Sequence, residues 1–463
     1  MKQKETIAAI ATAMGTAGIS IIRISGKDAI SITDRIFKAK NQKCLAFSKS
    51  HTIHYGYIME EGHKIDEVLV LIMKAPNTYT KENIVEIDCH GGAMVTNRIL
   101  QVVIRNGARL AEPGEFTKRA FLNGRLDLSQ AEAVIDIIHA ENEYALQSSM
   151  QQLSGNLRRK IEELRKQILL ELSFLEAALD DPEHICLDGF SEKLSENIEK
   201  WSIELKKLLS TADTGRILRE GVKTAIIGKP NAGKSSLLNL LAGQERAIVT
   251  EIAGTTRDVL EEQILLQGGL SLILMDTAGI HNSSDQVEKI EIEKAKASLY
   301  QADLILFVFD VSKGFSEEDK QIAELIEQKP VIILLNKIDL KEEWNLEDFE
   351  IKFSNLKDAV KIPFSAKKGI GLEQLQQRIL SMFYQGAVSY NNEIFLTRAR
   401  HKESIENAIN SLFAVKESIA CHMPEDFFSI DLMDAYEALG KIIGEAVEDD
   451  LVNTIFKEFC MGK

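Results

Sequence analysis

Residues 228–235 read Gly-Lys-Pro-Asn-Ala-Gly-Lys-Ser. This stretch matches the phosphate-binding loop pattern G-x-x-x-x-G-K-[ST] with no substitution. An apolar run at 222–227 precedes it and apolar residues at helical spacing follow it, which is the strand–loop–helix context that the pattern requires. Backbone N–H groups in such a loop and the start of the helix favour phosphate. We predict that Lys234 neutralises the terminal phosphates and that the Ser235 hydroxyl binds Mg²⁺.

The base-recognition motifs indicate that the nucleotide is GTP. Residues 336–339, Asn-Lys-Ile-Asp, follow the apolar run 331–335. The Asp339 carboxylate can accept hydrogen bonds from both guanine N1–H and the exocyclic N2 amine, and adenine lacks this pair of donors. Residues 365–367, Ser-Ala-Lys, complete the base pocket through a backbone N–H to the guanine carbonyl.

Two motifs between these elements are typical of GTPase switch segments. Residues 276–279, Asp-Thr-Ala-Gly, can hold Mg²⁺ through water and donate an N–H to the γ-phosphate. Within 254–258, Gly-Thr-Thr-Arg-Asp, Thr256 is the predicted second Mg²⁺ ligand. The predicted GTP-binding residues are Asn231, Ala232, Gly233, Lys234, Ser235, Ser236, Thr250, Glu251, Ile252, Ala253, Gly254, Thr255, Thr256, Asp276, Thr277, Ala278, Gly279, Asn336, Lys337, Asp339, Ser365, Ala366 and Lys367.

One common hydrolytic residue is missing. Many GTPases carry a glutamine after Asp-Thr-Ala-Gly that orients the attacking water, and this chain has Ile280 there. Hydrolysis is therefore expected to be slow, to depend on another protein, or to use a residue and a cation from elsewhere.

Composition narrows the class of protein. A chain of 463 residues is too long for one core, so about three domains are expected. The longest apolar runs fall short of the roughly 20 residues of a membrane span, and the N-terminus lacks the apolar region of a secretory signal. Five scattered cysteines without C-x-x-C spacing favour the reducing cytoplasm over a disulfide framework or a zinc site. The net charge of −15 means that any RNA contact is either a local basic patch or shared with a partner.

Periodicity predicts a multidomain chain that combines α+β, α/β and α parts. We expect an N-terminal α+β domain at 1–118, with strands at 19–24, 67–72 and 84–87 and a helix at 97–105. A helical domain is expected in two segments, 119–218 and 384–463, with one buried stripe at Ile161, Leu164, Ile168, Leu172, Leu175 and Leu179, and a last helix running to Phe459. An inserted Ras-like P-loop GTPase domain at 219–383 is expected from strands at 222–227, 272–275, 304–309 and 331–335.

The chain resembles the tRNA-modification GTPase family MnmE, also called TrmE, over essentially its whole length. Besides the phosphate-binding loop, the resemblance rests on further motifs spread along the chain. These are Arg-Ile-Ser-Gly at 23–26, Pro-Gly-Glu-Phe at 113–116, Phe-Leu-Asn-Gly-Arg-Leu-Asp-Leu at 121–128, Ile-Ala-Gly-Thr-Thr-Arg-Asp at 252–258, Asp-Thr-Ala-Gly at 276–279 and Cys-Met-Gly-Lys at 460–463.

The resemblance implies a folate-dependent activity on tRNA. The N-terminal domain is then a dimerisation domain that binds a one-carbon tetrahydrofolate, of the 5,10-methylene or 5-formyl type. The implied reaction builds a C5 aminomethyl-type group, such as carboxymethylaminomethyl, on the wobble uridine of certain tRNAs. A flavoprotein partner resembling MnmG, which supplies FAD, is expected to join the homodimer in a heterotetramer or larger complex.

The resemblance also implies the residues of the sites. K⁺ is expected beside the phosphates, with Asn231, Thr250, Ile252 and Thr255 as ligands, where its charge lowers the barrier to hydrolysis. The predicted catalytic residues are Glu288, which would orient water, Lys234, and the near-terminal Cys460. The folate-binding residues implied are Arg23, Glu82, Arg125 and Lys463; judged without the family, each would be a surface charge.

Three positions depart from the family pattern. Residues 13–18 read Ala-Met-Gly-Thr-Ala-Gly in place of Pro-Pro-Gly-x-Gly-Gly. His281 stands where arginine is usual, so switch contacts there are expected to be weaker. Cys89 replaces the first glycine of Gly-His-Gly-Gly.

Two alternatives to the potassium-activated tRNA-modifying GTPase stay open at this stage. The chain could be a binding switch, a ribosome-assembly type of GTPase without a part in base chemistry. It could also be a folate-dependent transferase whose GTPase domain is only regulatory.

Overall fold

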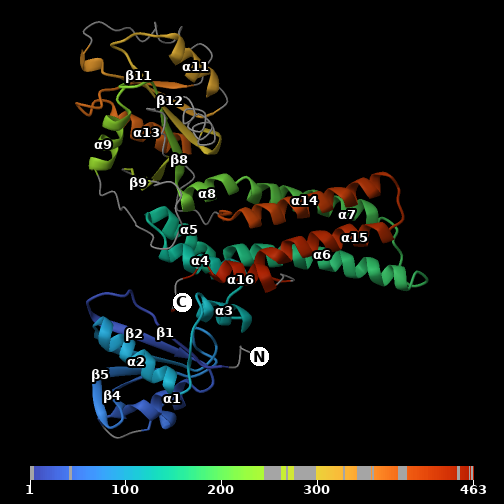
Figure 1. Cartoon of the computed structure of the whole chain (residues 1–463). Helices are drawn as coiled ribbons and strands as arrows, with labels where there is room; N and C mark the ends of the chain where they lie inside the picture. Colours follow the sequence, from blue (N-terminus) through green and yellow to red (C-terminus); the bar gives the residue numbers. More distant parts are fainter. Residues whose placement is uncertain are drawn as a thin grey trace, which may run out of the picture. The chain divides into compact units, whose positions relative to one another are not determined.

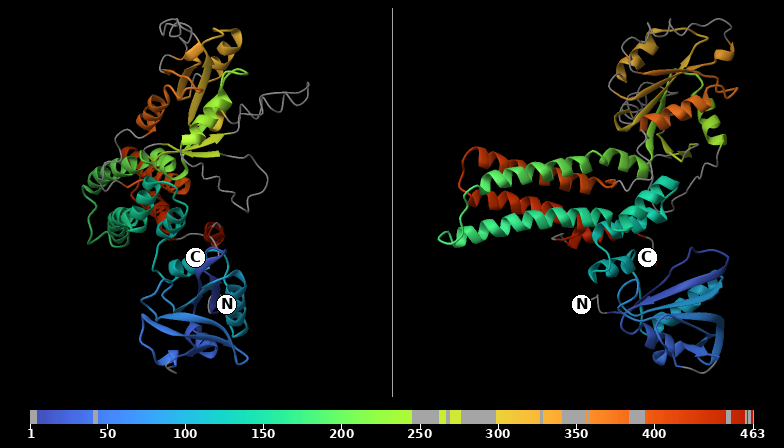
Figure 2. Two further views of the ribbon diagram at one scale, coloured as in Figure 1. Left: turned by 90° about the vertical axis from the view of Figure 1, so that its left-hand side faces the viewer. Right: turned by 180° about the vertical axis from the view of Figure 1, so that it is seen from behind.

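The computed structural model describes residues 5–40, 44–244, 262–266, 269–275, 299–326, 329–340, 356, 359–383, 394–445, 449–457, 459 and 462 (Figures 1 and 2). These residues form two compact units. The first unit comprises Met1–Ile138, Gln152–Ile203 and Glu403–Lys463, and the second comprises His139–Gln151 and Glu204–Lys402.

A mixed sheet organises the N-terminal part of the first unit, in the order β3-β4-β5-β6-β2-β1-β7. Its strands are β1 (Ile7–Ile10), β2 (Ala17–Ser25), β3 (Phe37–Ala39), β4 (Thr52–Glu60), β5 (His63–Met73), β6 (Ile84–Gly91) and β7 (Arg109–Leu110). All described pairs are antiparallel except β1 with β7. The helices α1 (Ala29–Ile36) and α2 (Ala93–Arg105) cover one face, and alternate strand residues such as Ile22, Ile24, Val68 and Val70 are buried beneath them.

The strands expected at 19–24, 67–72 and 84–87 lie within β2, β5 and β6, and the helix expected at 97–105 lies within α2. Each confirmed strand alternates buried and more exposed residues, because one face packs on helices and the other does not. Sequence periodicity did not predict β4. Its buried Gly56 lies where an added Cβ would meet Lys38 O at 2.3 Å, so the strand lacks a side chain at one of its core positions.

Helices form the rest of the first unit. They are α3 (Glu115–Leu122), α4 (Leu128–Ile138), α6 (Asn156–Asp180), α15 (Asp426–Ile443) and α16 (Asp449–Lys457), with α7 (Phe190–Leu209) and α14 (Ala399–Ala420) mostly included. The stripe predicted on α6 is buried from Ile161 to Leu175, whereas Leu179, at the end of the helix, is 39% exposed. The prediction of Leu179 as a core residue was wrong because the buried position of the last turn is Ala178, so Leu179 lies beside the buried stripe.

The C-terminal region contains two helices where one was expected. Gly444 ends α15 with φ +88°, in the left-handed region, and α16 starts at Asp449. Phe456 and Phe459 then pack with Ala120 and Leu128. The end of the chain therefore packs against the segment that follows the N-terminal sheet.

A six-stranded sheet organises the second unit, in the order β13-β12-β11-β8-β10-β9. Its strands are β8 (Val222–Ile227), β9 (Glu262–Leu265), β10 (Ser271–Met275), β11 (Leu304–Asp310), β12 (Val331–Asn336) and β13 (Val360–Pro363). All described pairs are parallel except β9 with β10. The helices of this unit are α5 (Glu143–Leu153), α8 (Ala212–Glu220), α9 (Lys234–Gln244), α11 (Glu317–Leu325) and α13 (Leu372–Phe383).

The four strands predicted for the nucleotide domain are confirmed, and β11 and β12 are buried at every position. The fold is therefore the expected one: an N-terminal domain of sheet and helices, a helical domain in two chain segments, and an inserted nucleotide domain. Within the described part of the chain, the search for a helix long and apolar enough to cross a membrane found none.

Candidate functional site

The phosphate-binding loop connects β8 to α9, as its pattern predicts. Gly228 and Gly233 have φ +149° and +109°. A Cβ on Gly228 would lie 2.2 Å from Val308 O, and one on Gly233 would lie 2.1 Å from Asn336 Nδ2. Both positions therefore require glycine, for conformation and for space. The loop also holds Asn231 at φ +61°, where a non-glycine residue is uncommon.

Lys234 is the first residue of α9 and points back along the loop. Its Nζ donates to Gly228 O at 2.6 Å and to Lys229 O at 2.9 Å. Burial lowers the pKa of this ammonium. The ammonium of Lys234 is thus held at the loop, where it can pair with a bound phosphate. The next residue, Ser235, is exposed at the start of the helix. This placement fits the predicted roles of both residues.

The base-recognition motif is attached directly to the phosphate loop. Asn336 Nδ2 donates to Ala232 O at 2.7 Å, and Asn336 Oδ1 accepts from Ala366 N at 3.0 Å. Ser365 Oγ donates to Asp339 Oδ1 at 2.7 Å, and this bond lowers the pKa of Asp339. The two predicted base-pocket segments and the phosphate loop therefore meet at the carboxyl ends of β8 and β12, where a parallel sheet binds ligands.

A buried carboxylate that no motif predicted supports this arrangement. Lys337 Nζ donates to Asn231 O and to Asp310 Oδ2, both at 2.6 Å. Asp310 ends β11, is 1% exposed, and accepts from Ser312 N and Oγ with its other oxygen. Burial would raise the pKa of Asp310, but the bonds from Lys337 and Ser312 outweigh it and lower that pKa. Asp310 thus holds Lys337 against the phosphate loop.

Several predicted site residues lie outside the described residues. They are Thr250, Glu251, Ile252, Ala253, Gly254, Thr255, Thr256, Asp276, Thr277, Ala278, Gly279, Glu288, Cys460 and Lys463, together with Ile280 and His281. The described members of the nucleotide set are Asn231, Ala232, Gly233, Lys234, Ser235, Ser236, Asn336, Lys337, Asp339, Ser365, Ala366 and Lys367.

A second cluster of predicted residues lies in the first unit, around the ring of Tyr79. The guanidinium carbon of Arg125 lies 4.7 Å from the ring centroid and that of Arg23 lies 5.7 Å from it. Arg23 Nε donates to Glu86 Oε1 at 2.7 Å, and Arg23 Nη1 donates to Gly462 O at 3.3 Å. Two predicted arginines about 100 residues apart in sequence therefore meet at one aromatic ring, and one of them also contacts Gly462.

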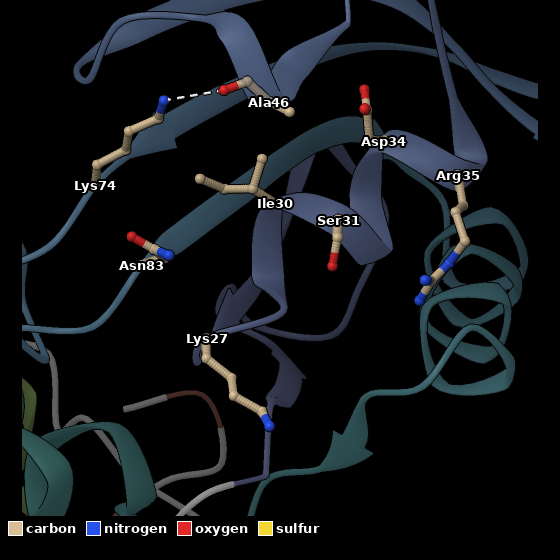
Figure 3. A pocket seen from close by; sticks show the side chains of 8 residues that line it. All are labelled: Lys27, Ile30, Ser31, Asp34, Arg35, Ala46, Lys74 and Asn83. Atoms are coloured by element: carbon tan, nitrogen blue, oxygen red, sulfur yellow. Dashed lines mark hydrogen bonds between the residues drawn. The ribbon is translucent and has the colours of Figure 1, made fainter.

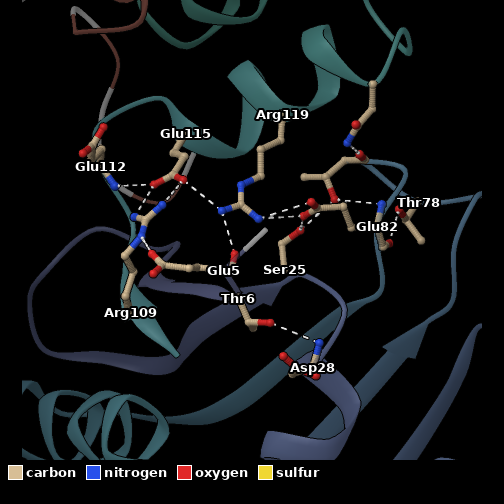
Figure 4. A network of polar contacts seen from close by, with 12 residues as sticks. Glu5, Thr6, Ser25, Asp28, Thr78, Glu82, Arg109, Glu112, Glu115 and Arg119 are labelled. Carbon is tan, nitrogen blue, oxygen red and sulfur yellow. Dashed lines mark hydrogen bonds and ion pairs between the residues drawn. The ribbon is translucent and has the colours of Figure 1, made fainter. Parts of the chain in front are cut away.

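The third described member of that set, Glu82, belongs to a polar network (Figure 4). Its carboxylate accepts two bonds from Arg119 Nη1, at 3.2 and 3.0 Å, and one from Ser25 Oγ at 2.8 Å. Arg119 comes from α3, is 4% exposed, and also donates to Glu115 Oε1 at 3.0 Å. Arg119 therefore fixes the Glu82 carboxylate in place.

Arg109 and Glu115 extend the network. Arg109 donates to Glu115 from two nitrogens, at 2.6 and 2.8 Å. Burial alone would raise the pKa of Glu115, but bonds from Arg109, the Glu112 backbone N–H and Arg119 lower it to about 2. The carboxylate is therefore ionised throughout the physiological range and anchors both arginines.

Comparisons with known proteins match both parts of the chain. The family model described as the MnmE helical domain matches residues 128–460, and the model described as the GTP-binding protein TrmE N-terminus matches residues 6–125. The tRNA modification GTPase MnmE of Lachnoclostridium phytofermentans is 56% identical over 460 residues, which cover 99% of each chain. The chain belongs to the MnmE family.

Other MnmE relatives and one solved structure give the range of similarity. The tRNA modification GTPase MnmE of Alkaliphilus oremlandii is 46% identical over 99% of each chain. An Aquifex aeolicus Era variant bound to GDP and AlF₄⁻ is 36% identical over 35% of this chain and 56% of that chain, with a TM-score of 0.29. As a member of the MnmE family, this chain is a GTPase of tRNA modification, and GTPase chemistry implies Mg²⁺.

Sequence reasoning missed three residues that organise these MnmE-family sites: Asp310, Tyr79 and Arg119. Each lies outside the motifs but touches a residue that was predicted to belong to a site. A signal was present only for Asp310, which stands at the carboxyl end of a fully apolar strand, where functional residues gather in parallel sheets.

Proposed function

We propose that this MnmE-family GTPase is activated by K⁺ and, with an MnmG-like flavoprotein, installs a C5 aminomethyl-type group on the wobble uridine of certain tRNAs. The carbon would come from a 5,10-methylene- or 5-formyl-tetrahydrofolate type of ligand. The observation that carries the proposal is the meeting of Arg23, Arg125 and the carbonyl of Gly462 around Tyr79. In an MnmE-family chain, this cluster is the proposed folate pocket, with Glu82 and Lys463 as its other members.

The chemistry of the cluster suits a folate. A folate carries glutamate carboxylates, for which guanidinium groups are strong hydrogen-bond donors, and a pterin ring that can donate to a carboxylate. Arg23 is only partly neutralised, because its Nε binds Glu86 whereas its Nη1 contacts a backbone carbonyl. The centroid of the Tyr79 ring lies 5.7 and 4.7 Å from the guanidinium carbons of Arg23 and Arg125, and the ring adds a flat apolar surface to the cluster.

The folate pocket is tested by isothermal titration of the full-length protein with 5-formyltetrahydrofolate. Arg23→Ala is expected to abolish binding and to leave GTP hydrolysis unchanged. Arg98→Ala removes an arginine that pairs with Glu60 on the surface of α2, and serves as the matched control. Retained folate binding in the Arg23 variant would contradict this pocket.

Potassium activation is proposed for the nucleotide site. Asn231 stands in the phosphate loop with its backbone carbonyl bound by Lys337, so the position of its side chain is limited by the loop. A cation bound by Asn231 and by the carbonyls of Thr250, Ile252 and Thr255 would add positive charge where the transition state develops negative charge. Glu288 is the proposed water-orienting residue, since Ile280 cannot serve.

GTP turnover measured in KCl and in NaCl tests this mechanism. We expect faster turnover in KCl, and we expect Asn231→Ala to remove the difference while Asn239→Ala, on the exposed side of α9, keeps it. Equal rates in the two salts for the unaltered protein would refute the cation mechanism.

A homodimer is proposed on the N-terminal sheet. Tyr55 pairs across the strands with Leu69, and both are exposed on the face that α1 and α2 do not cover, as is Ile53. Large exposed apolar side chains in one cross-strand row are typical of an interface. Arg23 lies on the same face of the sheet. Residues directly opposite one another on neighbouring strands share a face, and the register aligns Ile53, Leu71, Glu86 and Arg23 across β4, β5, β6 and β2.

The remaining parts of the proposal concern location and reaction. The proposal also includes a cytoplasmic location, a role of Cys460 in the modification, and the domain boundaries 1–118, 119–218, 219–383 and 384–463. Nucleoside analysis of tRNA from cells that lack the protein tests the reaction, and a loss of the C5 modification at the wobble uridine is expected. Unchanged nucleosides would contradict the proposed reaction and favour the alternative hypothesis of a ribosome-assembly type of GTPase.

A further inference from the structure

We infer that a basic hollow on the helix-covered side of the N-terminal sheet is an RNA-binding surface. The hollow encloses about 560 Å³ and is lined by Lys27, Ile30, Ser31, Asp34, Arg35, Ala46, Lys74 and Asn83 (Figure 3). The inference rests on the proposed function in one respect, namely that tRNA is the substrate of this chain.

Local charge separates this domain from the rest of the chain. Residues 1–118 contain sixteen lysines and arginines against twelve aspartates and glutamates, whereas the whole chain carries a net charge of −15. Phosphate attraction is the dominant sequence-independent contribution to RNA affinity. An RNA that approaches this acidic protein is therefore favoured at the N-terminal domain over the remainder.

The cations of the hollow are available to a polyanion. Figure 3 shows Lys27, Arg35 and Lys74 spread around Ile30 and Ser31. Lys74 Nζ donates to Ala46 O at 3.2 Å and Arg35 Nη2 donates to Asn106 O, so both rest on neutral carbonyls rather than on carboxylates. Lys27 lies 4.0 Å from Asp28, the distance of a loose surface pair.

The one carboxylate that lines the hollow already has donors of its own. Asp34 Oδ1 accepts from Leu45 N at 2.7 Å, and its Oδ2 accepts from Cys44 Sγ at 2.6 Å. These bonds tie α1 to the short helix η2 (Leu45–Phe47). The lining therefore carries three cations against one anion, and that anion serves a structural purpose.

An exposed aromatic residue that follows the lining residue Ala46 in sequence gives the second feature of an RNA surface. Phe47 follows Ala46 directly and is 91% exposed. Unpaired bases stack on solvent-exposed aromatic rings while lysines and arginines of the same surface contact the phosphates. A purely protein-binding patch would be expected to carry several apolar neighbours, whereas the other lining residues here are mostly polar.

The hollow lies one residue away from the proposed folate pocket. Asn83 lines the hollow, and its neighbour Glu82 is held by Arg119 and Ser25 in the pocket. Gly26 N donates to Asn83 O at 3.0 Å, and this bond joins the end of β2 to the loop that precedes β6. The two sites thus use neighbouring residues of one loop, while Arg23 of the pocket lies on the opposite face of the sheet from the hollow.

The test measures RNA binding by the full-length protein with an unmodified tRNA transcript and with an RNA hairpin that has an unpaired loop. Phe47→Ala is expected to weaken binding about tenfold, since stacking of a base on an aromatic ring contributes about 1–3 kcal/mol. The triple change Lys27→Gln, Arg35→Gln, Lys74→Gln is expected to weaken binding and to lower the slope of log K against log salt by about 2, at roughly 0.7 per phosphate contact.

Matched controls lie on other helices. Phe413→Ala removes a phenylalanine that is 59% exposed on α14, and the triple change Lys200→Gln, Lys206→Gln, Lys207→Gln removes three positive charges from α7. Both controls are expected to bind RNA as the unaltered protein does. Basal GTP hydrolysis and 5-formyltetrahydrofolate binding are expected to stay unchanged in all variants.

Three results would overturn the inference: undetectable RNA binding by the unaltered protein, equal losses in the hollow and control variants, or a Phe47 variant that loses a protein contact but keeps RNA affinity. The outcome is separable from that of the proposed function. RNA binding lost in the hollow variants, in a protein whose absence leaves wobble uridine unchanged, would support the surface and refute the reaction.

Discussion

Replacement of Asp310 by asparagine is expected to weaken guanine-nucleotide binding without changing the rate at which the bound GTP is hydrolysed. The Lys337 ammonium lies 2.6 Å from Asp310 Oδ2 and 2.6 Å from Asn231 O, so it connects the end of β11 to the phosphate loop. Lys337 has φ +67° and Asn231 has φ +61°, two uncommon conformations in contact. Weakening the bond that holds them makes the free site less ordered, and binding must then restore that order.

The magnitude follows from the type of bond. A hydrogen bond between charged groups contributes about 1.5–3 kcal/mol, roughly twice a neutral one. Asparagine has nearly the same shape, can still accept from Lys337, and loses only the contribution of the charge. A loss of about 1–1.5 kcal/mol is expected, which is about a five- to tenfold higher Kd for GDP. Because the bond is made before and after hydrolysis, kcat at saturating GTP is expected to stay within about twofold.

A double-mutant cycle with Lys337→Met distinguishes this role from a general loss of stability. If Asp310 acts through Lys337, Asp310→Asn has little further effect on GDP affinity once the ammonium is gone. Asp303→Asn is the control, because Asp303 bonds to Arg216 at 2.6 Å and to Lys223 N at 3.0 Å on the same sheet. Additive losses in the cycle, or an equal loss of affinity in the Asp303 variant, would refute the reasoning.

Three further outcomes are expected. Glu115 has a pKa of about 2 in the folded protein, against an ordinary value of 4.5, so it should contribute about 3 kcal/mol to the free energy of unfolding above pH 5. This contribution is lost as the pH falls toward 2, and urea unfolding of Glu115→Gln at a series of pH values should not show that loss. Gly233→Ala should abolish GDP binding and lower Tm, because the new methyl would lie 2.1 Å from Asn336 Nδ2 at a φ of +109°. Gly243→Ala meets no atom within 4 Å and should bind GDP normally. Gly462→Ala should weaken folate binding measured by titration, since its Cβ would lie 2.3 Å from Ile10 O; unchanged affinity would contradict a fixed tail.

The nucleotide domain could be predicted because its signals are short in sequence. The loop at 228–235 and the motif at 336–339 each lie next to a largely apolar strand, so the local pattern predicts both the element and the position of the side chains. Their mutual bonds could not be predicted. The bond from Asn336 to Ala232 O joins residues 104 positions apart and depends on the order of β8, β11 and β12.

The N-terminal cluster was predictable only through the family resemblance. Arg23, Glu82 and Arg125 carry no local pattern, and the residues that organise them, Tyr79 and Arg119, lie in a loop and in a helix whose partners are distant in sequence. The burial of Arg119 in particular contradicts the default expectation for an arginine, and it arises from two carboxylates on separate segments.

Both sites hold their key polar groups through ion pairs in which one partner is buried. Asp310 fixes Lys337 in the nucleotide site, and Arg119 fixes Glu82 in the N-terminal cluster. Breaking such a pair leaves a buried charge unpaired, which costs more than the pair itself contributes. The pairs therefore limit the conformations of Lys337 and Glu82 before a ligand arrives, and this preorganisation, rather than the number of ligand contacts, is what the two sites have in common.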